Sequence, residues 1–188
     1  MLNRPVSRTY EDFAIEVKKN EEVRFIEYLD ELADEYKQSL LGVYEGDVLS
    51  DKYQEFHNSI LKTESPIERI LYVAINHLLH TQYGEYMHYI TPQFEVPDSN
   101  YRVDFLVHMA DSNWRINADV LVEVDGHQFH QKTKDQVARD KKRDRHLVRD
   151  FGKLITFTGS EVYANPSACA EEVIAILRRD LIKQIKNK

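Results

Sequence analysis

The amino-acid sequence predicts an α/β domain preceded by a helical segment. In several stretches the apolar residues recur at three- and four-residue intervals, which is typical of amphipathic helices. Between these stretches lie short runs rich in β-branched residues and bounded by Pro, Gly, Asp or Asn, which are typical of strands. Hydrophobic residues make up 42% and charged residues 30% of the 188 residues, as in a globular protein with one domain and an appendage.

Residues 1–63 form the appendage, for which helices are predicted over residues 9–41 and 47–61. Residues 1–64 carry 15 acidic and 8 basic side chains, whereas the rest of the chain carries 17 of each. The whole net charge of −7 therefore lies in this segment. Two interpretations are open. The helices pack on the domain as a cap, or they present an acidic surface that binds a protein partner or repels unsuitable polyanions.

A helix start is predicted near the beginning of the second domain, residues 64–188. Ser65 suits the N-cap, Pro66 the first helical position, and Glu68 a capping box with Ser65. Apolar residues then follow through Leu79 in a stripe that is too wide for a surface helix. This helix is therefore expected to lie buried against a sheet.

Three strands, a helix, a fourth strand and a last helix are expected next. Asp104 lies near the middle of the second strand, and Gly152 is expected to end the helix that follows the third. Because a helix joins the third and fourth strands, these two should be parallel neighbours. The expected bounds are 87–96, 101–109 and 118–125 for the first three strands, 133–151 for the helix, 153–158 for the fourth strand and 166–186 for the last helix.

The composition argues against several classes of protein. No apolar run approaches the length of a membrane span, and the first residues lack the apolar core of a signal peptide, so a cytoplasmic protein without membrane contact is expected. Cys169 is the only cysteine, which excludes an internal disulfide and fits a reducing compartment. One cysteine and eight dispersed histidines also show no zinc-ligand spacing.

The stretch from Ala118 to His130 is the most informative about function. Strand alternation sends Glu123 and Asp125 to the same face, roughly 7 Å apart. Neighbouring carboxylates raise each other's pKa and reduce stability unless a cation or hydrogen-bond donors intervene. Because hard oxygen ligands suit divalent cations, this stretch predicts a metal site.

Four ordered motifs carry a family resemblance. They are Ser65-Pro66-Ile67-Glu68, Val103-Asp104-Phe105, Val122-Glu123-Val124-Asp125-Gly126 with His130, and Asp140-x-x-Arg143-x-x-x-Leu147-x-x-x-Phe151-Gly152. On the expected order of helices and strands, this set resembles the restriction-endonuclease-like PD-(D/E)XK superfamily. Within it, the chain is similar to the branch that holds very-short-patch repair endonucleases and the bacterial domain of unknown function 559. The resemblance covers about residues 64–185.

The resemblance implies a restriction-endonuclease-like core of helix, three strands, helix, strand and helix, with an added N-terminal helical segment. It also implies a nuclease that acts on DNA, with RNA not excluded, and that uses Mg²⁺ or Mn²⁺ to activate the attacking water. Asp104 would be the aspartate of the second strand and Glu123 the acidic residue of the (D/E)xK element, both as metal ligands. The carbonyl group of Val124 could complete the coordination.

The chain departs from the family pattern at Asp125, which occupies the usual lysine position. The very-short-patch branch also lacks this lysine, and a histidine beyond the strand assists there at the scissile phosphate; His130 stands at the corresponding place. Asp125 is either a further ligand or the first residue of a turn with Gly126. Glu68, which the family places near the metal through water, is equally explained by its capping box.

Basic residues before and within the helix at 133–151 are candidates for phosphate contacts. These candidates are Lys132, Lys134, Arg139, Lys141, Lys142 and Arg145. Aspartates are interleaved with them, so ordinary pairing on a helix surface is the alternative.

The sequence as a whole predicts a metal-dependent nuclease. The alternative is a nuclease-fold protein that has lost turnover and serves as a nucleic-acid-binding or protein-interaction module. The missing lysine and the acidic leading segment favour this alternative. Retention of Asp104, Glu123 and His130 together favours the enzyme.

Overall fold

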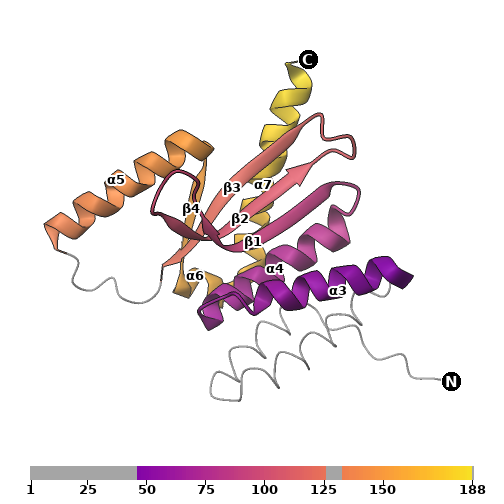
Figure 1. The fold of residues 1–188 in the computed structure, drawn as a ribbon, viewed down its shortest axis with the longest axis horizontal. Coiled ribbons are helices and arrows are strands. Elements are labelled where there is room, and N and C mark those ends of the chain that lie inside the picture. Colours follow the sequence, from indigo (N-terminus) through magenta and orange to yellow (C-terminus); the bar gives the residue numbers. More distant parts are fainter. Residues whose placement is uncertain (1–45, 126–132, 188) are drawn as a thin grey trace.

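The computed structural model describes residues 46–125 and 133–187, which form a four-stranded mixed sheet with helices (Figure 1). The predicted α/β class is confirmed. The predicted strand ends and most predicted helix ends differ from the observed ones by one residue at most, whereas the helix followed through Leu79 in the sequence ends at Gln82. The helices predicted over residues 9–41 lie outside the described residues. The elements are α3 (Gly46–Ile60), α4 (Pro66–Gln82), β1 (Met87–Glu95), β2 (Arg102–Ala110), β3 (Asn117–Asp125), α5 (Lys134–Phe151), β4 (Leu154–Thr158), α6 (Gly159–Ala164) and α7 (Pro166–Lys186).

The sheet has the strand order β1-β2-β3-β4. Strands β1, β2 and β3 are antiparallel neighbours, as expected for strands joined by short turns. Strand β4 pairs with β3 in parallel, which confirms the prediction from the helical connection through α5. The register places Phe105 opposite Val122, so the preceding residue of β2, Asp104, lies beside Glu123 of β3.

The helix ends lie where the local chemistry predicts them. Ser65 has an extended backbone, and its Oγ accepts a hydrogen bond from the backbone N of Glu68 at 3.2 Å. Helix α5 begins with a capping box of Thr133 and Gln136. It ends at Gly152, whose φ of 80° is a left-handed conformation that glycine adopts at little cost.

Helix α6 is the one described element that the sequence pattern does not predict. Thr158 ends β4 and is also the N-cap of α6, with Glu161 completing a capping box. The helix has 6 residues, too few to show a helical period. It turns the chain directly from the sheet into α7.

The larger part of the core lies between one face of the sheet and helices α3, α4 and α7. Tyr72 of α4 is buried between Phe56 of α3 and Phe105 of β2, with ring centroids 5.7 and 6.3 Å away. Helix α4 has buried residues around most of its circumference, which confirms the prediction of a helix buried against a sheet. Burial of these large side chains is the main source of stability of this layer.

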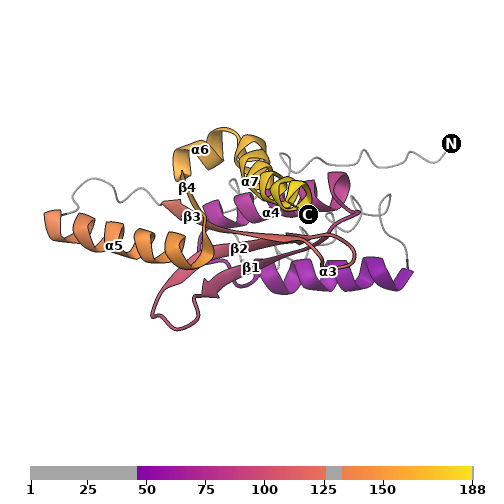
Figure 2. The same cartoon turned by 90° about the horizontal axis from the view of Figure 1, so that it is seen from above.

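A smaller apolar cluster lies on the opposite face, beneath α5. Leu147 of α5 is fully buried there against Leu106 and Leu121 of the sheet, and Phe94 meets Phe151 edge-on at 5.7 Å. Figure 2 shows α6 and α7 on one side of the strands and α5 apart from them. Helix α5 is therefore attached by its C-terminal half, and its polar side is available to solvent. Among the described residues, no helix is long and apolar enough to cross a membrane.

Buried His80 and partly buried His88 join α4 to β1. His80, which is 4% exposed, lies with its Nδ1 3.1 Å from Nε2 of His88. Because Nδ1 of His88 donates to the carbonyl of Tyr86 at 3.0 Å, Nε2 of neutral His88 is the acceptor and His80 is the donor. Burial, with a contribution from His88, lowers the pKa of His80 to about 3, and burial also lowers the pKa of His88. Both rings are therefore neutral at neutral pH.

This pair predicts a loss of stability in acid. The pKa of His80 falls from 6.5 in the unfolded chain to about 3 in the folded one, so its stabilising contribution is complete above pH 6.5 and is lost as the pH falls toward 3. His80→Gln retains a donor without titrating and should weaken the pH dependence of the free energy of unfolding in this window. Chemical denaturation of the wild type and of His80→Gln at several pH values measures the free energy of unfolding.

Candidate functional site

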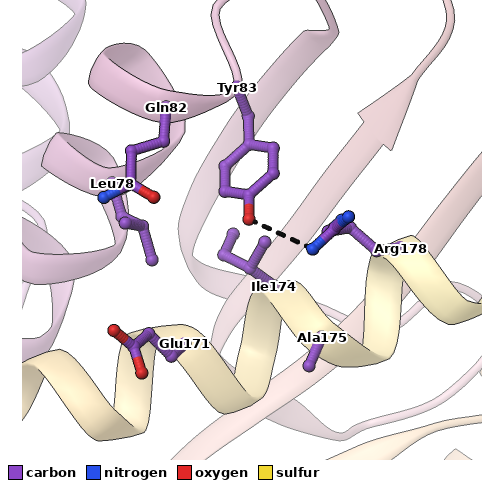
Figure 3. Close-up of a pocket in the computed structure, with 7 residues that line it drawn as sticks. All are labelled: Leu78, Gln82, Tyr83, Glu171, Ile174, Ala175 and Arg178. Carbon is purple, nitrogen blue, oxygen red and sulfur yellow. Dashed lines mark hydrogen bonds between the residues drawn. The ribbon is translucent and has the colours of Figure 1, made fainter.

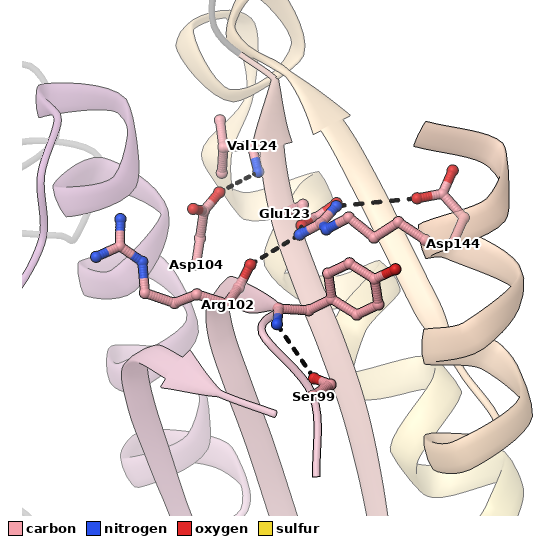
Figure 4. A network of polar contacts seen from close by, with 8 residues as sticks. Ser99, Arg102, Asp104, Glu123, Val124 and Asp144 are labelled. Carbon is pink, nitrogen blue, oxygen red and sulfur yellow. Dashed lines mark hydrogen bonds and ion pairs between the residues drawn. The ribbon is translucent and has the colours of Figure 1, made fainter. Parts of the chain in front are cut away.

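Three carboxylates from separate elements converge at one end of the sheet. Asp104 comes from β2, Glu123 from the neighbouring position of β3, and Glu68 from the first turn of α4. Both glutamates raise the pKa of Asp104 through their charges, which places all three groups within electrostatic reach. Figure 4 shows Asp104 and Glu123 on adjacent strands. The register of the sheet thus brings together the two carboxylates that the sequence predicts as metal ligands.

Asp104 is the most perturbed acid of the described residues. Its Oδ2 accepts a hydrogen bond from the backbone N of Val124 at 2.7 Å (Figure 4). Burial raises its pKa to about 7; the bond from Val124 opposes this rise, and the charges of Glu68 and Glu123 add to it. At neutral pH the carboxyl group is therefore near the middle of its titration. A nearby cation would favour its ionised form.

Glu68 is held by more than the predicted capping contact. Its Oε1 accepts from Ser65 Oγ at 2.7 Å, and its Oε2 accepts from Glu64 N at 2.9 Å. Oε2 also accepts from Nε2 of Gln93 at 2.8 Å, across from β1. Gln93 has a φ of 51°, an uncommon left-handed conformation for a residue other than glycine. The carboxylate therefore caps α4 and, with the same oxygens, connects α4 to β1 beside Asp104.

Arg143 of α5 forms an ion pair with Glu123. Its Nη1 donates to Glu123 Oε2 at 3.0 Å, and its Nη2 contacts the other carboxylate oxygen. Nη2 also donates to the carbonyl of Arg102 at 2.7 Å, and the guanidinium lies 6.0 Å from the ring centre of Tyr101. The bond to Glu123 raises the pKa of Arg143. Arg143 belongs to the family motif and to the basic run of α5, but its pairing with Glu123 is not predicted from the sequence.

The donor set suits a hard divalent cation, although the side chains do not yet enclose one. Within residues 46–125 and 133–187, no group of three or more His, Cys, Asp or Glu side chains is placed to hold a metal. Glu123 faces Arg143, and Asp104 faces the N–H of Val124. The raised pKa of Asp104 nonetheless means that its ionised form is poorly stabilised in the structure, so a bound cation would stabilise it.

Other predicted site residues lie at the end of β3 or beyond it. Asp125 is the last residue of the strand, is partly buried, and pairs in register with Thr158 of β4. His130 and Lys132 lie outside the described residues, so their predicted roles stay predictions. Val124, whose carbonyl is a predicted ligand, contacts Asp104 through its N–H group.

The predicted phosphate-binding residues of α5 project to solvent. Arg139, Lys141, Lys142 and Arg145 are all exposed, and Lys134 begins the helix. Pairing with the interleaved aspartates, the alternative interpretation, occurs at Arg149, which donates to Asp150 at 2.7 Å. Lys142 and Arg145 instead line a hollow of about 290 Å³, together with Tyr101, His146 and Arg149.

A second hollow, of about 240 Å³, lies between the end of α4 and helix α7 (Figure 3). Arg178 extends beside the ring of Tyr83 and approaches its hydroxyl group at 3.5 Å. Glu171 lies on the other side of the opening. The two charged residues of its lining are of opposite sign, and none of the three converging carboxylates lines it.

Comparisons of the chain with protein-family models, with curated proteins and with solved structures find no match. The predicted family resemblance is therefore neither supported nor contradicted by a relative. The mixed α/β fold and the arrangement of Asp104, Glu123, Glu68 and Arg143 are the observations from which a function is inferred.

The environment of Asp104 predicts a stability change on removal of its charge. The folded-state pKa, about 7, lies above the ordinary value of 3.8, so stability decreases as pH rises between these values and the whole cost is present above pH 7. Asp104→Asn keeps an acceptor for Val124 N–H and should stabilise the protein in EDTA at pH 8 by on the order of 2–4 kcal/mol, since one pKa unit corresponds to ~1.4 kcal/mol.

Thermal or chemical denaturation of both proteins at pH 4 and pH 8 tests this expectation. At pH 4 the difference should be small. A variant that is less stable than the wild type at pH 8 in EDTA would mean that the carboxylate is stabilised by contacts other than those described.

Proposed function

We propose that the chain is a metal-dependent nuclease with a restriction-endonuclease-like PD-(D/E)XK core, which hydrolyses phosphodiester bonds in DNA. The observation that supports this most strongly is the convergence of Asp104, Glu123 and Glu68, with a pKa of about 7 for the central Asp104. Buried carboxylates that repel one another are costly, and proteins place them together where they serve a cation or catalysis. The order of the surrounding elements is the order that the resemblance implies.

Asp104 and Glu123 are the proposed ligands of Mg²⁺ or Mn²⁺, with the carbonyl of Val124 beside them and Glu68 acting through water. The bound metal supplies a Lewis acid for the phosphate and lowers the pKa of the attacking water. Asp104 contributes in its ionised form, which a nearby positive charge favours over the protonated form. Glu68, fixed by Ser65 and Gln93, holds this part of α4 against β1.

Arg143 has a proposed role at the scissile phosphate. Its guanidinium group neutralises Glu123 in the structure and is anchored by the carbonyl of Arg102. A guanidinium group binds phosphate oxygens through paired hydrogen bonds, in the same way that it binds a carboxylate. Arg143 would therefore be able to hold a substrate phosphate, and the charge that develops on it, in place of Glu123.

Cleavage of DNA by the purified protein is the direct test. Supercoiled, linear, mismatched and single-stranded DNA should be incubated with Mg²⁺, Mn²⁺ or EDTA. Asp104→Asn should abolish cleavage, because it removes a charged ligand while the protein stays folded. Asp98→Asn is the matched control: this residue lies in the exposed β1–β2 turn with a φ of 57°, which asparagine tolerates. Full cleavage in Mg²⁺ by folded Asp104→Asn protein would refute the proposed site.

His130 is the proposed proton-transfer group, because Asp125 stands at the usual lysine position. A positioned general acid or base contributes ~10²–10⁴-fold, so His130→Ala should lower single-turnover cleavage by about this factor. DNA and metal affinity should stay nearly unchanged, and the wild-type titration of the rate near neutral pH should disappear. Cleavage by His130→Ala at the wild-type rate would contradict this role of His130. The next candidates for proton transfer would then be Lys132, Lys141 and Gln128.

The second candidate function is a nuclease-fold module that binds nucleic acid or protein without turnover. The ion pair between Arg143 and Glu123 favours it, because a carboxylate that keeps this partner is not available to a metal. Salt-dependent DNA binding without cleavage in any metal would select this module over the nuclease.

A further inference from the structure

The hollow between α5 and Tyr101 combines an aromatic ring with several basic groups. Its volume is about 290 Å³, near the lower end of the range of ligand sites, ~300 Å³. Its α5 residues follow the spacing of one helix face, so their side chains point to the same side. The lining residues are Tyr101, Lys142, Arg145, His146 and Arg149.

The basic groups of this hollow are only partly neutralised. Arg149 donates to Asp150 at 2.7 Å, and His146 lies 3.2 Å from the same carboxylate. Lys142 and Arg145 have no ion-pair partner among the described residues, and both are exposed. Two cationic side chains are thus available to an anion.

The backbone of Tyr101 is held in place by the turn before β2. The backbone N of Tyr101 donates to Ser99 Oγ at 3.1 Å, and its carbonyl accepts from Val96 N at 2.9 Å. His146 meets the ring edge-on, with centroids 5.3 Å apart and planes at 70°. The backbone of Tyr101 is therefore anchored, and its ring lies in the lining of the hollow beside His146.

The hollow adjoins the carboxylate site through Arg143. This side chain contacts Glu123 and also lies 6.0 Å from the ring centre of Tyr101. A strand whose phosphate lies at Arg143 would therefore place a neighbouring nucleotide at the hollow. The hollow beside α7 lacks this combination, since it has an acid, Glu171, opposite its arginine.

We propose that this hollow binds one unpaired nucleotide of the substrate strand, with its base against Tyr101 and its phosphate between Lys142 and Arg145. A base reaches an aromatic side chain only when it is not stacked in a duplex, and such stacking is tolerant of sequence. The inference rests on the proposed nuclease function and specifies its substrate as DNA with a single-stranded or frayed segment beside the cleaved bond.

Fluorescence anisotropy with labelled single-stranded and blunt duplex oligonucleotides in EDTA tests the binding separately from cleavage. Tyr101→Ala and Tyr101→Leu should weaken single-strand binding by about 5- to 150-fold, the range of one base–aromatic stack, and Tyr101→Phe should not. The leucine variant keeps apolar bulk at this position if alanine impairs folding. Binding to blunt duplex should change little in any of the three.

Salt dependence reports the phosphate contacts. The double substitution of Lys142 and Arg145 by alanine should flatten the log–log salt slope for single strands by about 0.7, since the two side chains bind one phosphate and each neutralised phosphate contributes about 0.7. The matched control is the double alanine substitution of Arg179 and Lys183, two exposed basic residues of α7, which should leave the slope unchanged.

Wild-type single-strand affinity in both Tyr101→Ala and Tyr101→Leu would overturn the proposal, as would an equal loss for single strand and duplex. An unchanged slope in the Lys142 and Arg145 variant would also overturn it. Cleavage assays keep the two inferences apart. Binding that depends on Tyr101, without cleavage in any metal, supports the nucleotide site and refutes the nuclease. Cleavage that depends on Asp104, with binding that does not depend on Tyr101, supports the nuclease and refutes the nucleotide site.

Discussion

The register between β2 and β3 is the constraint on which the candidate site depends. It sets Asp104 beside Glu123, one position beyond the paired residues Phe105 and Val122. The hydrogen bond from Val124 N to Asp104 Oδ2 also joins the two strands at this end. A shift of one residue would turn the carboxylates to the other face of the sheet. The buried residues of both strands oppose such a shift, because they fill one apolar layer against α4 and α7 and another beneath α5. Packing of the sheet thereby fixes the positions of the Asp104 and Glu123 carboxylates.

The concentration of negative charge at this end of the sheet is balanced by α5. Arg143 brings a guanidinium group to Glu123, while Leu147, one turn further along the same helix, is buried beneath it. One helix therefore joins the apolar cluster, the ion pair and the basic residues at the hollow. Such a helix couples the position of the proposed substrate strand to the state of Glu123, because both are held by consecutive turns of one rigid element.

Much of the fold follows from local patterns, and the site follows from them only in part. Two helices are located by their capping residues, Ser65 for α4 and Thr133 and Gly152 for α5. Strand alternation locates Asp104 and Glu123. The pairing of Arg143 with Glu123 could not be predicted in this way, because its sequence signal is one arginine among several on a basic helix. Glu68 shows a further limit: a capping box accounts for it locally, yet Gln93 of a distant strand binds the same carboxylate.

The sequence by itself determined the order of the longer helices and the strands, most of their ends and the parallel placement of β4 beside β3, because these depend on short-range periodicity, caps and the handedness of connections. Only the tertiary structure decided which polar groups meet. The contacts of Glu123 with Arg143 and of Glu68 with Gln93 span 20 and 25 residues, and the raised pKa of Asp104 arises first from burial. Burial and long-range partners depend on how helices and strands pack against one another. The local sequence of one element does not specify which distant element it will contact.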